Sequence, residues 1–258
     1  TVWPLAARAQ QTKMARIGLL LVSGPEPIGP FHEGLRELGY VEGKNIQIEV
    51  RSALGQATRL PELAAELVRS QVDVIVAVQT PAAHAAKNAT RDIPIVMLAG
   101  DPIATGLISN LARPEGNLTG LSGTAAEAAA KSLELILEIV PGALRVGVLA
   151  NGNDPFAKPF LEQIQQAAPG LRLEVHQIIV RDSDELDGAF AAIAGERADA
   201  VVIQGSLPVK PTVDLALKHR LPSISTQKSA VQAGIMMTYG ASFAERGRQI
   251  AFYVDKIL

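Results

Sequence analysis

The chain of 258 residues contains no cysteine, and only 4% of its residues are aromatic. The missing cysteine excludes disulfides, thiolate-bound zinc, cysteine nucleophiles and a lipid-anchored N-terminal cysteine, but it leaves the cellular compartment open. The scarcity of rings predicts an aliphatic core and leaves few aromatic side chains for a binding site.

Basic runs and long apolar runs are also missing. The net charge is −2 with no cluster of Lys and Arg, which argues against nucleic acid or an anionic membrane as the partner. No stretch approaches the roughly 18 apolar residues that a membrane span needs. With 48% hydrophobic and 19% charged residues, the composition is typical of a soluble α/β protein.

Signatures of catalysis are missing too. The four histidines, His32, His84, His176 and His219, have no metal-ligand spacing. The chain has no G-x-G-x-x-G, no Walker A loop and no G-x-S-x-G motif. We therefore expect no catalytic residues, no metal and no cofactor.

The N-terminal stretch "TVWPLAARAQQ" is similar to the end of a secretory signal, because Ala7 and Ala9 form an A-x-A pattern before Gln10. It predicts cleavage after Ala9, an exported protein, and a signal-peptide remnant or N-terminal arm over residues 1–14. An irregular arm without a targeting role is the alternative. At the other end, the last helical pattern has no stop signal before Leu258, so the gene product is expected to continue.

Short apolar runs alternate with segments of helical period along the chain, which predicts parallel sheets flanked by helices. Helical spacing is clearest over Phe31–Leu38 and Leu60–Val68. The expected strands are Arg16–Val22, Ile46–Arg51, Val72–Val78, Ile95–Leu98, Leu144–Leu149, Leu171–Ile178, Ala200–Ile203 and Ser223–Ser225.

The two halves of the chain resemble each other. "ARIGLLLVSG" from Ala15 matches "LRVGVLANGN" from Leu144, and "VDVIVAVQT" from Val72 matches "ADAVVIQGS" from Ala198, at offsets of 129 and 126 residues. Matches in unbroken order predict two copies of one βα unit, and hence two similar lobes.

The lobes are expected to divide at glycine-rich segments. The stretch Arg113–Thr124, with Gly116, Gly120 and Gly123, suits a hinge, and Ala233–Ser242 suits a second crossing. We expect lobe 1 to comprise 15–119 and 239–258, with "FAERGRQIAFYVDKIL" as a final helix that returns to it, and lobe 2 to comprise 120–238.

Ligands of parallel sheets bind beyond the carboxyl ends of the strands, so the residues there are the candidate contacts. In lobe 1 they are Ser23, Gln79, Thr80, Pro81, Gly100 and Asp101; in lobe 2 they are Asn151, Asn153, Gly205, Ser206 and Gln227; the aromatic residues nearest the expected cleft are Phe31, Phe156 and Tyr239.

Thr80 and Pro81 form an N-cap and N1 pair, whose free backbone N–H groups and positive dipole would favour a carboxylate. Thr80 capping its own helix is an equally good interpretation. Asp101 before Pro102 needs no ligand to explain it, loop Asn residues are common in turns, and each aromatic residue suits the core as well as a cleft.

Several stretches carry a resemblance to a known family: "FHEGLRELGYVEGKNIQIEVRSALG", "VDVIVAVQTPAAHAAKNATRDIPIVML", "DPIATGLISNLARPEGNLTGLS" and "AGIMMTYGASF" with "YVDKIL". They resemble the ABC-transporter substrate-binding protein family with a type I periplasmic-binding fold, relatives of which include aromatic amino-acid binders. The resemblance runs from about Ala15 to Leu258 and is most specific in "ARPEGNLTGLS".

The resemblance implies a soluble periplasmic receptor that closes two lobes on a small carboxylate-bearing ligand, an amino acid or aromatic acid. It also implies that the receptor passes this ligand to a membrane permease served by an ATPase. It also implies that Thr80 and its neighbours hold the carboxylate. "SGPEPIGPF" lacks the His-Pro pair expected of aromatic amino-acid binders in that loop. We expect a monomer that is not an enzyme; a two-lobed transferase or isomerase using the same cleft, or a regulator core of the same fold, are the alternatives.

Overall fold

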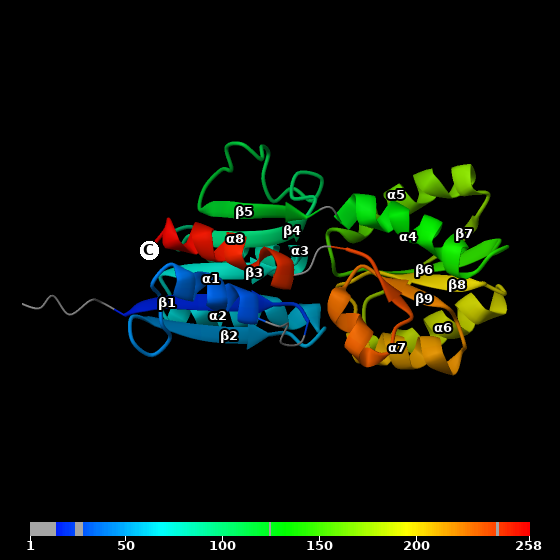
Figure 1. Cartoon of the computed structure of the whole chain (residues 1–258), viewed down its shortest axis with the longest axis horizontal. Helices are drawn as coiled ribbons and strands as arrows, with labels where there is room; N and C mark the ends of the chain where they lie inside the picture. The colour runs from blue at the N-terminus through cyan, green and yellow to red at the C-terminus, as the bar shows by residue number, and fades with distance from the viewer. Residues whose placement is uncertain (1–13, 24–27, 124, 241–242) are drawn as a thin grey trace, which may run out of the picture.

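The computed structural model describes residues 14–23, 28–123, 125–240 and 243–258. The expected cleavage site at Ala7 and Ala9 lies outside these residues, as do Thr124 and Ser242 at the ends of the two expected crossings. The molecule has two α/β lobes, which lie one after the other along its longest axis (Figure 1). This arrangement confirms the predicted fold class.

The first lobe is built on a five-stranded parallel sheet in the order β2-β1-β3-β4-β5. Its strands are β1 (Ala15–Leu21), β2 (Ile46–Ser52), β3 (Val74–Val78), β4 (Ile95–Gly100) and β5 (Leu118–Gly123). Its helices are α1 (Gly29–Glu37), α2 (Leu60–Arg69), α3 (Thr80–Ala89) and α8 (Phe243–Asp255), with a short 3-10 turn at Ala57–Arg59.

The second lobe repeats this plan with a sheet in the order β7-β6-β8-β9-β10. Its strands are β6 (Arg145–Asn151), β7 (Glu174–Val180), β8 (Ala200–Ile203), β9 (Ser223–Ser225) and β10 (Met237–Thr238). Its helices are α4 (Ala125–Ile139), α5 (Ala157–Ala167), α6 (Leu186–Gly195) and α7 (Val209–Lys218), with 3-10 turns η2 (Ala168–Leu171), η3 (Ser183–Glu185) and η4 (Lys228–Ala233). The common strand order is the structural counterpart of the sequence repeat.

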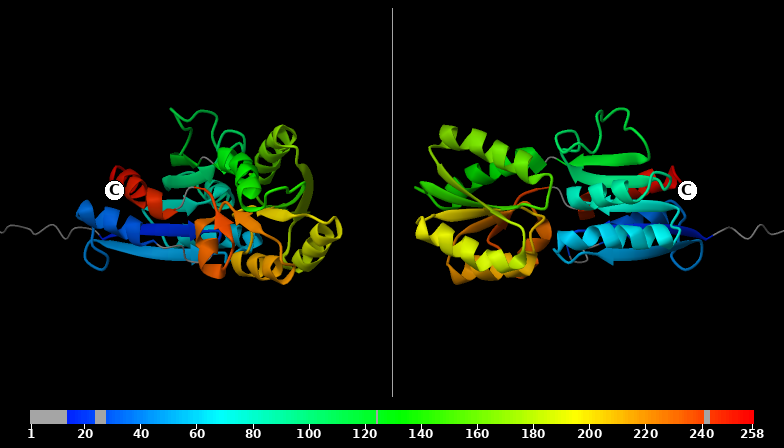
Figure 2. Two further views of the ribbon diagram at one scale, coloured as in Figure 1. Left: turned by 45° about the vertical axis from the view of Figure 1, so that its right-hand side comes forward. Right: turned by 180° about the vertical axis from the view of Figure 1, so that it is seen from behind.

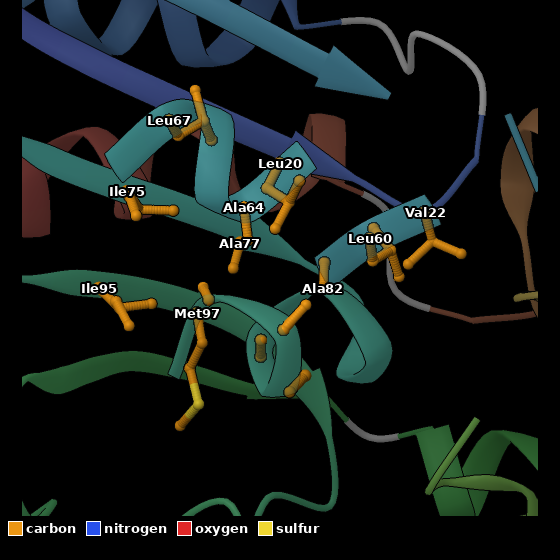
Figure 3. Packing of buried hydrophobic residues seen from close by; sticks show 14 of the residues in the cluster. Leu20, Val22, Leu60, Ala64, Leu67, Ile75, Ala77, Ala82, Ile95 and Met97 are labelled. Carbon is orange, nitrogen blue, oxygen red and sulfur yellow. The ribbon is translucent and has the colours of Figure 1, made fainter. Parts of the chain in front are cut away.

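Helices cover both faces of each sheet, which explains why the central strands are apolar throughout. All five residues of β3 are buried. On one face of the first sheet, Leu60 and Leu67 of α2 pack against Leu20, Ile75 and the other strand residues drawn in Figure 3. On the opposite face lie α1 and α8. The two helical layers hold the strand ends in fixed positions at the boundary between the lobes.

The last helix, α8, packs on α1 of the first lobe although the second lobe lies between them in sequence (Figures 1 and 2). Glycines permit this close approach: a Cβ on Gly247 would stand 2.6 Å from the backbone nitrogen of Phe31, and one on Gly34 would stand 2.9 Å from Cβ of Ala251. The chain enters the second lobe before α4, which packs on α5 there, and it returns to the first lobe before α8. It therefore passes between the lobes twice.

The second half of the glycine-rich segment expected to form the first hinge is a strand, β5. β5 is the edge strand of the first sheet, so the division drawn between 119 and 120 falls inside it. Gly120 is needed here because its φ is +135° and a Cβ would stand 2.1 Å from the carbonyl oxygen of Met97 on β4. Gly120 therefore serves close strand pairing, whereas Gly116 lies in the turn before β5, and the passage to the second lobe follows Gly123.

Candidate functional site

The carboxyl ends of strands from both sheets surround one cavity of about 110 Å³, which we call the central cavity. Both lobes contribute to its wall. Its lining residues are Val78, Gln79, Thr80, Leu98, Ala99, Gly100, Gly123, Asp154, Phe156, Gln204, Gly205, Ser206, Thr226, Gln227, Lys228 and Gly240.

Half of the candidate contacts meet at this cavity. They are Gln79, Thr80, Gly100, Phe156, Gly205, Ser206 and Gln227. Asn151 and Asn153 instead line a second space between the lobes, of about 290 Å³, which we call the side cavity. The first lobe contributes residues 55–58 to the side cavity. The strand-end rule therefore found residues from both lobes, distributed over two neighbouring cavities.

The other candidate residues line neither cavity. Phe31 is completely buried in the core beside α8, so it is not at the cleft edge. Asp101 accepts a hydrogen bond from the backbone N–H of Ala104 at 2.9 Å and thereby closes a turn. Pro81 is buried at the start of α3, while the Tyr239 side chain is exposed to solvent. Ser23 is buried one step from the cavity, where its hydroxyl donates to Gln79 Oε1 at 3.4 Å.

Gln79 connects the two lobes directly. Its side-chain Nε2 donates to the carbonyl oxygen of Gly205 at 3.0 Å. Its backbone has φ +75° and ψ 156°, a region that is essentially restricted to glycine. The backbone is held there by hydrogen bonds at both ends, to the carbonyl of Leu98 at 2.8 Å and from the N–H of Ala83 at 3.1 Å. Strain of this kind gathers at functional sites.

Thr80 fastens the start of α3 to the end of β4. The backbone N–H of Gly100 donates to the Thr80 hydroxyl oxygen at 3.1 Å, and the hydroxyl donates to the carbonyl of Gly100 at 3.3 Å. The helix begins one residue earlier than predicted: Gln79 is the N-cap, and Thr80 is the first helical residue rather than the cap. The Thr80 side chain bonds to Gly100 instead of capping the helix, and it fixes the first turn of α3 in the cavity wall. The N–H groups of a first helical turn have no partner within the helix, and they carry the positive end of the helix dipole.

Asp154 is the one acidic side chain among the described residues that line the central cavity, and the strand-end analysis missed it. It is 6% exposed. One carboxylate oxygen accepts from the backbone N–H of Phe156 at 2.9 Å and the other from Nε2 of Gln204 at 2.8 Å. No cationic side chain pairs with Asp154 within the described residues. Burial raises the pKa of its carboxyl from 3.8 to about 6, against the opposing effect of the Ser206 hydroxyl and the two hydrogen bonds.

A hydrogen-bonded network holds Asp154 in place. Oε1 of Gln204 accepts from the backbone N–H of Asn151 at 2.9 Å, and the Asn151 side chain donates to the carbonyl of Ser206 at 3.1 Å. The ends of β6 and β8 are thus tied together around the carboxylate. The sequence does offer a signal that could have identified Asp154: it is an acidic residue in "NGNDPF", directly after a buried strand.

The part of the chain that the structure describes contains no group of three or more His, Asp or Glu side chains that could hold a metal ion. It also contains no helix with the length and apolarity required to cross a membrane.

Comparison with known proteins adds independent findings. The family described as "ABC transporter substrate binding protein" matches residues 25–258. A curated tyrosine-binding protein from Clostridioides difficile strain R20291 is 30% identical over 224 residues, which are 84% of this chain but only 64% of that protein's length.

Solved structures show the same two-lobed fold. A conserved domain protein from Vibrio cholerae is 27% identical, with a TM-score of 0.82 over 95% of this chain and 85% of the other. An ABC domain from Streptococcus pneumonia, solved in complex with L-Trp, is 22% identical, with a TM-score of 0.80 over 94% of this chain and 84% of the other.

Proposed function

Because this chain belongs to the ABC transporter substrate binding protein family, we propose that it is the extracytoplasmic solute receptor of an ABC importer. It binds a small carboxylate-bearing ligand, an amino acid or aromatic acid, in the central cavity. The observation that carries this proposal is the convergence of strand ends from both lobes on one cavity with apolar walls and a few directed polar groups.

The carboxylate lies at the start of α3. There the first-turn N–H groups and the helix dipole favour an anion, and Thr80 holds the turn in place through Gly100. Lys228, which lines the same cavity, adds positive charge on the second lobe. Phe156 and Leu98 supply apolar surface for the remainder of the ligand. The tyrosine-binding relative and the structure solved with L-Trp support an amino acid as the ligand.

Binding closes the lobes by rotation at the two chain passages that follow β5 and β10. A ligand that touches both walls binds the closed arrangement better, and it shifts the population by that difference in affinity. The lobes are already close at two points: Gln79 bonds to Gly205, and a Cβ on Gly55 would stand 3.0 Å from Pro208. The closed monomer then delivers its ligand to a permease that is driven by a separate ATPase, from the periplasmic side of the membrane.

A thermal-shift screen with common L-amino acids and aromatic acids tests this function. A ligand at about 100 times its Kd stabilises the folded state by about 2.7 kcal/mol, which corresponds to a rise of several degrees in Tm. Small-angle X-ray scattering with the best ligand is expected to show a smaller radius of gyration. If no compound shifts Tm and none compacts the protein, the proposed function is wrong.

A further inference from the structure

The Asp154 carboxylate has a chemical environment that the protein alone does not explain. It is almost fully buried and it lines the central cavity. Lys228 lines the same cavity, but burial, Ser206, Phe156 and Gln204 are the influences on the Asp154 carboxyl, and no cation is among them within the described residues. Burying an ionised carboxylate without a counter-charge is unfavourable, so such groups are usually paired or serve a function.

A purely structural role accounts for only part of this arrangement. The bond from the Phe156 N–H to Asp154 is a turn before α5 that Asn or Ser would also form. The amide of Gln204 would bond equally to a neutral oxygen. Neither contact requires a negative charge. Each carboxylate oxygen accepts one of these two hydrogen bonds, and the Ser206 hydroxyl also favours the charged form. Capacity for a further donor remains, and the residue faces the space between the lobes.

We propose that Asp154 is the counter-ion of a ligand ammonium group, so that this receptor selects amino acids over carboxylic acids that lack an amine. This inference rests on the proposed function, since it concerns the same cavity. The ligand carboxylate lies at the start of α3 on the first lobe, and its ammonium lies at Asp154 on the second. The carboxylate and the ammonium of one zwitterion then bind to different lobes, so both charges are necessary for tight closure.

Calorimetric titration with matched pairs tests the selection. The probes are L-tyrosine with 3-(4-hydroxyphenyl)propanoate and L-tryptophan with 3-(indol-3-yl)propanoate, each pair differing only in the amine. The wild-type protein is expected to bind the amino acid at least about thirtyfold more tightly than its partner, the usual effect of removing one member of a buried, hydrogen-bonded charge pair.

The variant Asp154→Asn keeps the size of the side chain and removes its charge. It is expected to lose most of its affinity for the amino acid, while the deaminated compound binds as well as before or better. The matched control is Asp182→Asn, because Asp182 is an exposed acid beside the side cavity and its loss changes the net charge equally. This control is expected to keep the wild-type preference.

The pH dependence in the wild-type protein gives a readout that needs no variant. Asp154 must be ionised to bind an ammonium, so the Kd for the amino acid should rise as pH falls through about 6. The Kd for the deaminated compound should stay nearly constant there. If Asp154 had only a structural role, the Kd values of both ligands would change with pH in the same way.

Three results would overturn the inference. Equal affinity for both members of each pair would leave the receptor function intact but remove the ammonium site. The same is true if Asp154→Asn keeps the preference, or if the pH profiles of the two ligands coincide. If neither member of any pair binds and the wider thermal-shift screen is also empty, the proposed function falls, and this inference falls with it.

Discussion

The strained backbone of Gln79 predicts how substitutions at this position change the stability of the protein. Its φ of +75° and ψ of 156° cost a residue with a side chain about 1 to 3 kcal/mol. The Gln79→Ala variant keeps that strain and loses the hydrogen bond to Gly205, so it should be less stable than the wild type by about 1 kcal/mol. The Gln79→Gly variant loses the same bond but removes the strain.

Glycine therefore restores stability relative to alanine at this position. The relief of about 1 to 3 kcal/mol exceeds the extra flexibility that Gly brings to the unfolded chain, about 0.5 to 1 kcal/mol. The Gly variant should be the more stable by roughly 1 kcal/mol, the middle of a range that extends to about 2.5 kcal/mol. Each kcal/mol corresponds to about 2 to 4 °C in Tm in a chain of this size.

Urea and thermal unfolding of both variants measure this difference. The control is the same pair of substitutions at Gln163, in the interior of α5, where Gly should be less stable than Ala by about 1 kcal/mol. If Gly is also the less stable residue at position 79, Gln79 is not strained and the reasoning is refuted.

Three further predictions concern the site and the packing of the lobes. Thr80→Val should lower the free energy of unfolding by about 1 to 3 kcal/mol, because the N–H and C=O of Gly100 lose their partner. It should also weaken binding of the ligand carboxylate, and an unchanged calorimetric affinity would show that the carboxylate does not bind at Thr80. Burial raises the pKa of Asp154 from 3.8 to about 6, so ionising this carboxyl destabilises the folded state of the wild type. This destabilisation is absent below about pH 4, grows to roughly 3 kcal/mol as pH rises to 6 and is constant above. The stability of Asp154→Asn relative to wild type should therefore rise between pH 4 and 6 in denaturation curves, and a difference that does not change with pH contradicts this prediction. Gly247→Ala should destabilise the contact of α8 with α1 by about 1 to 3 kcal/mol, whereas Gly188→Ala, in open space on α6, should stabilise slightly; equal Tm values for these two variants would count against the packing described.

Much of the fold could be predicted because local hydrophobic patterns and the internal repeat of the sequence indicate it. Val74–Val78 is apolar throughout since helices cover both of its faces, and its counterpart Ala200–Ile203 shows the same pattern at the same place in the second lobe. β5 was missed because glycine, Thr and Ser dilute its apolar pattern. Its glycine at position 120 is explained by the carbonyl of Met97, a contact that only the folded sheet creates.

The site could be predicted less completely, for a physical reason. The strand-end rule locates a region, and Gln79, Thr80, Gly205 and Ser206, which it named, line one cavity. It does not say which loop residues turn inward. Asp154 was overlooked between Asn153 and Phe156, because its importance comes from burial without a cation, which no spacing of residues encodes.

The most direct test of the central claim is a crystal structure of the protein with its best-binding amino acid. We expect electron density for the ligand between the lobes in the central cavity, with its carboxylate at the first turn of α3 and its ammonium within hydrogen-bond distance of Asp154. A ligand outside this cavity, or one whose ammonium points away from Asp154, would contradict the account.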